Sequence, residues 1–177
     1  MRPSLVLLGL VVFAGCGDGG ERRAPQIDLD AFRSAQGPPI YWLGPSFDGY
    51  RLTYGDVNHR PGPVLLYGDC TPKRPKGLLN PDGGSCELPI QLYHLAVTLG
   101  RLKLGIPCVE RRLRDVPALL GDGILLYTGR TILRVRGPTR AHELRIVQAL
   151  RPINAGGRAR TPLPAPPAWV ERGLECR

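Results

Sequence analysis

Three arginines in the C-terminal half of the chain have a spacing that suits contact with an anion. Arg130, Arg134 and Arg136 lie in or directly before residues 131–136, a run of β-branched and apolar residues that is typical of a strand. Because side chains alternate between the two faces of a strand, the three arginines share one face. We therefore expect a positively charged, anion-contacting strand face. The competing interpretation is that these arginines only keep the surface solvated.

The net charge of +9 arises entirely in the second part of the chain. Residues 1–100 hold nine Lys/Arg and nine Asp/Glu, whereas residues 101–177 hold fifteen and six. Such a surface would attract anionic lipid headgroups or wall polymers, less strongly as salt rises. Nucleic acid is not an expected partner, because a 6% aromatic content offers no obvious platform for stacking bases. Further arginines that could extend the positive surface are Arg111, Arg112, Arg114, Arg140, Arg145 and Arg151.

The residues that could act as nucleophiles, acids or bases do not form a catalytic motif. Ser46 departs from the G-x-S-x-G nucleophile elbow, because Asp48 stands where the second glycine belongs. His94 lies in an apolar run and is expected to be a structural histidine. We therefore predict no catalytic residue, no metal site and no cofactor. The alternative is a small envelope hydrolase whose site forms only in three dimensions from dispersed Asp and His residues, such as His94.

The first fifteen residues are typical of an export signal. One positive charge at Arg2 precedes an apolar run over residues 5–13, and small residues follow at Ala14 and Gly15. The sequence Phe13-Ala14-Gly15-Cys16 resembles the lipobox of bacterial lipoproteins. This resemblance implies that Cys16 is diacylated, becomes the mature N-terminus and anchors the chain on the extracytoplasmic face of the cell membrane. The alternative is an ordinary secretory peptide in which the cysteine falls there by chance.

The remaining cysteines predict disulfides rather than a metal site. Cys70, Cys86, Cys108 and Cys176 are an even number in a chain expected to leave the reducing cytosol, and none forms a C-x-x-C pair. Four cysteines allow three pairings, and the sequence does not choose between them. A bond between Cys70 and Cys86 is preferred, since one ends an apolar run and the other begins the next. Cys108 would then pair with Cys176 by elimination.

Several segments have the pattern of regular secondary structure. The best hairpin joins residues 124–127 to residues 131–136 across Gly129 and Arg130. Thr139 has the character of a helix N-cap, and apolar residues at helical spacing follow it until Pro152 ends the helix. The other predicted strands cover residues 40–43, 50–54, 63–67 and 88–99.

These elements predict an α+β fold, mainly antiparallel β-sheet with one C-terminal packing helix and stabilised by disulfides. We expect a signal peptide over residues 1–15, a lipidated Cys16 with a flexible spacer to residue 39, and one extracytoplasmic domain over residues 40–177. The spacer holds one weak helical stretch over residues 28–33. Residues 152–177 form its Pro-rich tail. No apolar window reaches the roughly 18–20 residues of a membrane span, which excludes a multi-pass membrane protein.

Residues 40–52 carry a second resemblance. Ile40-Tyr41-Trp42-Leu43-Gly44, followed by Phe47, Gly49 and Leu52, is similar to a segment of uncharacterised exported proteins of high-GC Gram-positive bacteria, a family with no known activity. The use of Arg over Lys fits such a genome. The sequence thus predicts a lipid-anchored, non-catalytic binding or accessory module of the cell envelope, with its protein partners unknown.

Overall fold

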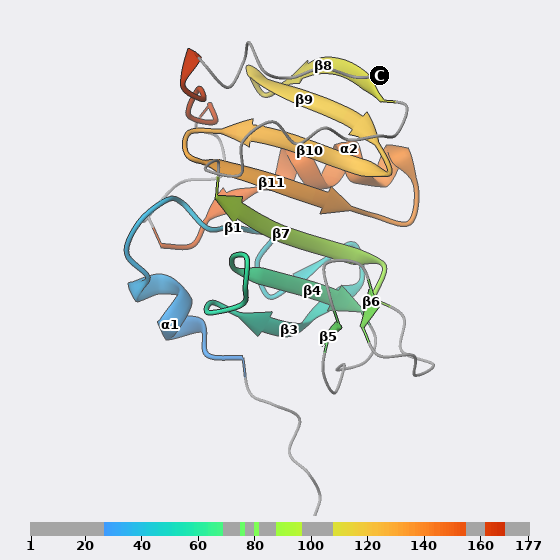
Figure 1. Ribbon diagram of the computed structural model, residues 1–177. Helices are drawn as coiled ribbons and strands as arrows, with labels where there is room; N and C mark the ends of the chain where they lie inside the picture. The colour runs from blue at the N-terminus through green and yellow to red at the C-terminus, as the bar shows by residue number, and fades with distance from the viewer. Residues whose placement is uncertain are drawn as a thin grey trace, which may run out of the picture.

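The computed structural model describes residues 27–68, 75–76, 80–81, 88–96, 108–154 and 162–168, and its centre is one eight-stranded sheet (Figure 1). Each strand in it runs antiparallel to its neighbours. In order across the sheet the strands are β2 (Ser46–Phe47), β3 (Tyr50–Asp56), β4 (Val64–Gly68), β7 (Ile90–Ala96), β11 (Thr131–Arg136), β10 (Gly123–Thr128), β9 (Val116–Gly121) and β8 (Val109–Leu113). The predicted, mainly antiparallel α+β fold is confirmed.

Two helices and two small ribbons complete the described elements. The helices are α1 (Leu29–Ser34) and α2 (Arg140–Ala149). The ribbons pair β1 (Tyr41–Trp42) with β12 (Arg151–Pro152) and β5 (Pro75–Lys76) with β6 (Asn80–Pro81), both antiparallel.

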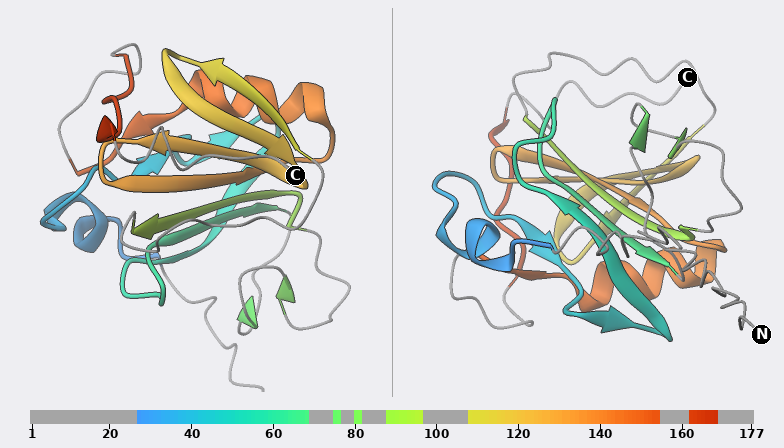
Figure 2. Two further views of the ribbon diagram at one scale, coloured as in Figure 1. Left: turned by 45° about the horizontal axis from the view of Figure 1, so that its top comes forward. Right: turned by 90° about the horizontal axis from the view of Figure 1, so that it is seen from below.

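The main core lies between one face of the sheet and α2 (Figure 2). Leu133 and Val135 of β11 and Ile146 and Val147 of α2 are completely buried there. The helix begins as predicted, because the Thr139 hydroxyl oxygen accepts a hydrogen bond from the His142 amide at 3.2 Å. The helix therefore covers the sheet face that carries the apolar side chains of the central hairpin.

The hairpin of β8 and β9 is an element that the sequence pattern does not predict. Its two turn residues, Arg114 and Asp115, have φ angles of 51° and 65°, a turn geometry that matches the twist of antiparallel strands. The turn places Arg114 at the end of α2, where its Nη1 donates to the carbonyl oxygens of Val147 at 3.2 Å and Leu150 at 2.8 Å. A guanidinium at this position satisfies carbonyls that a helix end leaves unpaired.

The helix α1 packs against the domain, although the sequence predicts a flexible spacer through residue 39. The Asp28 carboxylate accepts a hydrogen bond from the Ala31 amide at 2.8 Å and caps the helix. The Phe32 side chain is 1% exposed and lies in the main core. It lies against Gly55 of β3, where an added Cβ would be only 3.1 Å from the Phe32 ring. Residues 27–39 are therefore part of the packed structure.

The start and the end of the described domain lie side by side. In the ribbon of β1 and β12, Tyr41 pairs with Pro152 and Trp42 with Arg151. Farther along, residues 162–168 of the Pro-rich tail lie against the β10–β11 turn, with Leu163 buried in the main core. The part of the tail that is described thus packs on the sheet.

One of the predicted disulfide cysteines lies in the described region. It is Cys108, which lies directly before β8. Cys16, Cys70, Cys86 and Cys176 lie outside the described residues. The choice among the three pairings, and the stabilisation of the fold by disulfides, stay predictions.

Candidate functional site

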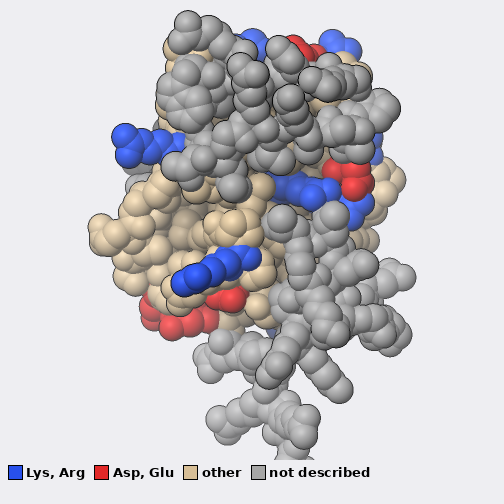
Figure 3. Space-filling view, in the orientation of Figure 1, with Lys and Arg blue, Asp and Glu red and all other residues tan. Residues whose placement is uncertain are grey.

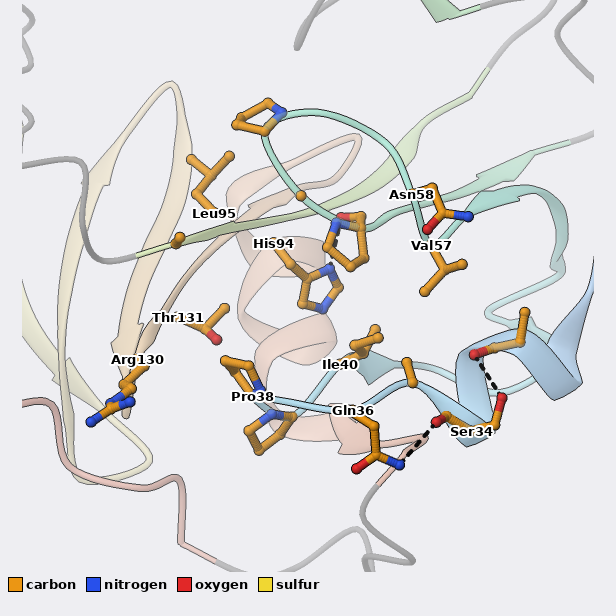
Figure 4. A pocket seen from close by; sticks show the side chains of 17 residues that line it. Ser34, Gln36, Pro38, Ile40, Val57, Asn58, His94, Leu95, Arg130 and Thr131 are labelled. Carbon is orange, nitrogen blue, oxygen red and sulfur yellow. Dashed lines mark hydrogen bonds between the residues drawn. The ribbon is translucent and has the colours of Figure 1, made fainter.

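A cleft of about 560 Å³ lies between α1, the loop 57–63 and the ends of β7 and β11 (Figure 4). This volume falls within the range of small-molecule sites. Its walls are largely apolar and include the prolines of two loops, with Ile40 and Leu95 between them. The polar side chains that line it are Ser34, Gln36, Asn58, His94, Arg130 and Thr131.

One wall of the cleft, residues 35–40, is held by Asn154. The Asn154 amide Nδ2 donates to the carbonyl oxygens of Ala35 and Pro38, both at 3.1 Å. The Asn154 Oδ1 accepts from the Ile40 amide at 2.8 Å. Because this wall is not a strand, its backbone groups need such side-chain partners. The three bonds fix the wall without a ligand.

The floor of the cleft is His94, whose two ring nitrogens both bind backbone. Its Nε2 accepts from the Tyr41 amide at 2.8 Å, so the proton lies on Nδ1, which donates to the Pro63 carbonyl oxygen at 3.0 Å. Burial lowers the pKa of His94 to about 4, so the ring is neutral at pH 7. Neither nitrogen is available as a general base. The structural interpretation of this histidine is confirmed.

The opposite wall, the loop 57–63, packs on β7 too closely for a side chain at residue 62. A Cβ added to Gly62 would lie 1.9 Å from the His94 carbonyl oxygen. The His94 amide also donates to the Pro63 carbonyl oxygen at 2.9 Å. This wall is therefore attached to the sheet by backbone contacts.

Arg130 lies at one end of the cleft, opposite Val57 and Asn58 (Figure 4). It is exposed, in the β10–β11 turn, where Gly129 has a φ of +53°. The Gly129 amide donates to the Pro164 carbonyl oxygen at 2.8 Å, which fastens the turn. Within the described part of the chain, Arg130 makes no ion pair or hydrogen bond. Its charge therefore stays available to a ligand.

Arg134 and Arg136, by contrast, share one carboxylate on the sheet face opposite α2. Arg134 Nη2 lies 3.3 Å from Asp122 Oδ2, and Arg136 binds Asp122 Oδ1. Their side chains are 16% and 33% exposed. Burial, and next the charge of Arg136, lower the pKa of Arg134. The structure thus brings these two arginines together as the alternation predicts, whereas Arg130 lies at the other end of β11.

Several of the other arginines are engaged inside the fold. Arg140 Nη1 lies 2.6 Å from Glu143 Oε2 and donates to the Gly123 carbonyl oxygen at 3.0 Å. The Arg151 guanidinium lies over the Trp42 ring, 5.3 Å from its centroid. Figure 3 accordingly shows the described basic side chains of one face scattered rather than gathered in one patch.

An aspartate–histidine pair forms away from the cleft. The turn between β2 and β3 places Asp48 Oδ2 at 3.3 Å from His142 Nε2 and at 2.8 Å from Arg145 Nη2. The contact between Asp48 and His142 is one of the kind that the hydrolase alternative requires. Ser46 lies in β2, paired with Arg51 of β3, and the turn follows at residues 48–49, so Ser46 does not lie in a strand-to-helix nucleophile elbow. The Asp48 carboxylate is already bound by a guanidinium.

The cleft itself was not predicted from the sequence. Its residues come from four separate segments, and one of them was interpreted as spacer. The available signals were the N-cap Asp28 and the aromatic Phe32, which together indicate a short helix with a buried side.

Comparison with protein-family models, curated proteins and solved structures finds no match for this chain. No helix among the described residues is long and apolar enough to cross a membrane. The same residues contain no group of three or more His, Cys, Asp or Glu that could hold a metal ion.

Proposed function

We propose that this chain is a lipid-anchored extracytoplasmic protein with a non-catalytic binding role. Its N-terminal pattern supports export and lipidation at Cys16. Residues 108–154 carry nine arginines against four carboxylates, which supports contact with an anionic envelope component, either lipid or wall polymer. Disulfides among Cys70, Cys86, Cys108 and Cys176 belong to the same proposal, since an exported domain is oxidised.

The observation that carries the proposal is the charge balance of one hairpin and its neighbouring turn. Arg130, Arg134 and Arg136 lie on or beside β11, and the only carboxylate that binds any of them within the described residues is that of Asp122. Strand pairing and partial burial restrict where these charges lie. Cations that are already positioned lose less conformational entropy on binding an anionic surface.

Cosedimentation of residues 17–177 with vesicles tests the surface contact. Neutral vesicles, anionic vesicles and isolated wall polymer are compared across a salt series, and binding to the anionic materials alone, weakening with salt, is expected. Each arginine near an anionic surface contributes about 1 kcal/mol, so Arg130→Gln weakens binding roughly fivefold. Asp122→Asn frees Arg134 and Arg136 and strengthens binding by a similar factor.

The matched control is Arg51→Gln, which removes one exposed charge from β3, outside the basic half. If Arg51→Gln and Arg130→Gln weaken binding equally, the effect is one of net charge and the proposed surface is wrong. Absence of binding at low salt contradicts the proposal as well.

Labelling with a fatty-acid probe tests the anchor. Wild-type chain is expected to take up the probe and Cys16→Ser to take up none, while Cys70→Ser retains the label. An ordinary secretory peptide would give an unlabelled wild type, and label that persists in Cys16→Ser would contradict lipidation at this cysteine.

A further inference from the structure

The cleft between α1 and the loop 57–63 has the features of a preformed binding site. Asn154 fixes one wall by three hydrogen bonds, and His94 and its backbone attach the other wall to β7. A site whose walls are ordered before binding avoids the entropic cost of ordering them in the complex. The cleft is therefore ready to accept a ligand.

The charges that line the cleft indicate which sign of charge a ligand would carry. Arg130 is the one ionised side chain among the described residues that line it, because none of them is Asp or Glu and His94 is neutral. A cationic ligand would meet a positive charge and no carboxylate. A divalent metal ion would find no acidic oxygen, and Zn²⁺ would find both nitrogens of His94 in use.

The number of charged hydrogen-bond donors and the apolar character of the walls narrow the class of ligand further. A phosphate group usually meets several charged or backbone donors, such as a helix N-terminus or a group of backbone amides, whereas the described lining of this cleft holds one charged donor, the guanidinium of Arg130. The Ser34 hydroxyl and the Gln36 amide already donate to backbone carbonyl oxygens. One guanidinium matches one carboxylate, which it can bind through two parallel hydrogen bonds. The apolar and proline-rich walls, with Ile40 and Leu95, match an apolar body.

We propose that this cleft binds a small monocarboxylate with an apolar body, whose carboxylate pairs with Arg130. The ligand body lies over His94 and between the walls formed by residues 35–40 and 57–63. This inference goes beyond the proposed contact with anionic surfaces, because it concerns a small-molecule cleft that shares only Arg130 with that surface and needs neither the lipid nor the envelope.

The test is a titration of the full-length protein in nanodiscs of neutral phospholipid. The probes are 4-phenylbutanoate and its uncharged amide, 4-phenylbutanamide, followed by ligand-observed NMR, with empty nanodiscs giving the correction for partition into lipid. The carboxylate is expected to saturate and to bind about tenfold more tightly than the amide, since a charge-assisted pair replaces a neutral contact.

Three variants locate the site. Arg130→Gln is expected to abolish the preference for the carboxylate and leave the affinity for the amide unchanged. Arg111→Gln, an exposed arginine of β8 that lies outside the cleft, keeps the preference. Ala96→Phe, at the exposed edge of the cleft, weakens both probes because the new ring occupies their space.

Equal affinities of the two probes for the wild-type protein would overturn the proposal. So would an equal loss in Arg130→Gln and Arg111→Gln, or the absence of saturable binding. Protein that takes up no fatty-acid label is titrated in buffer without nanodiscs, and the readout is still the preference for the carboxylate over the amide. Absence of vesicle binding or of lipid labelling therefore does not decide this titration, and the two proposals fail separately.

Discussion

Acid is expected to destabilise this protein through His94. The ring is completely buried, faces Tyr41 at a centroid distance of 6.4 Å, and has its two nitrogens bound to backbone. Its pKa is about 4 in the folded protein against 6.5 when unfolded. Below pH 6.5 the unfolded chain therefore binds a proton at His94 that the folded protein does not bind. The free energy of unfolding falls as the pH is lowered, until the pH reaches the folded pKa. The loss is about 2 kcal/mol at pH 5 and about 3 kcal/mol at pH 4.

Urea unfolding followed by tryptophan fluorescence at pH 7, 6, 5 and 4 measures this loss. Other groups titrate in the same range, so the comparison is with His94→Gln, which retains a donor and an acceptor but carries no titrating ring. The variant is expected to lose about 3 kcal/mol less than the wild type between pH 7 and pH 4. Parallel pH profiles of wild type and His94→Gln would refute the assignment of a neutral, structural histidine.

Three further substitutions test packing and capping. Gly62→Ala places a methyl group against the His94 carbonyl oxygen and is expected to lower the free energy of unfolding by about 1–3 kcal/mol, measured by urea titration; an unchanged midpoint contradicts the close approach of this loop. Arg114→Asn removes the guanidinium from the end of α2, while asparagine still accepts the positive φ of this turn. We expect thermal unfolding to show a loss of about 1–2 kcal/mol in the free energy of unfolding, whereas the control Arg111→Asn, at an exposed position, changes it little. Tyr67→Phe leaves a buried backbone amide without its acceptor at 3.0 Å and is expected to cost about 1–3 kcal/mol, whereas a loss below about 0.5 kcal/mol would mean that another acceptor replaces the hydroxyl.

Local signals made the central hairpin and α2 predictable. Residues 124–136 combine two β-rich runs with a turn that contains Gly129, and Thr139 with the apolar spacing after it fixes the start of the helix. The type of each of these elements is specified by residues that are close in the sequence. Tertiary contacts determine only where the element lies in the fold.

The elements that were missed lack such local signals. The strand β8 carries three charged residues in five and shows no alternation, and its turn uses Arg114 and Asp115 in place of glycine. Pairing with β9 makes it a strand. For α1 the sequence indicates a weak helical stretch over residues 28–33, and what was missed is its packing: so short a helix is marginal alone and depends on the burial of Phe32 for its stability.

The cleft and the ion pairs depend on contacts between distant residues. Asn154 reaches Ala35 across 119 positions, and Arg145 reaches Asp48 across 97. The sequence identifies the charged residues but not their partners. The sheet geometry places Arg134 and Arg136 beside Asp122, whereas Arg130 has no ion pair with any residue that the structure describes.

The pairing of β1 with β12 has a consequence for the order in which the domain folds. Ile40 and Asn154, which join next to this ribbon, are 114 positions apart. In a chain made from its N-terminus, the hairpin of β10 and β11 can form from neighbouring residues, whereas β1 has no strand to pair with, and residues 35–40 lack their bonds to Asn154, until residues 151–154 have been synthesised. Contacts between such distant positions form slowly. Residues 35–42 are thus synthesised early but reach their final contacts late. A chain that stops before residue 151 retains its central hairpin but lacks Asn154, which holds the wall of the cleft.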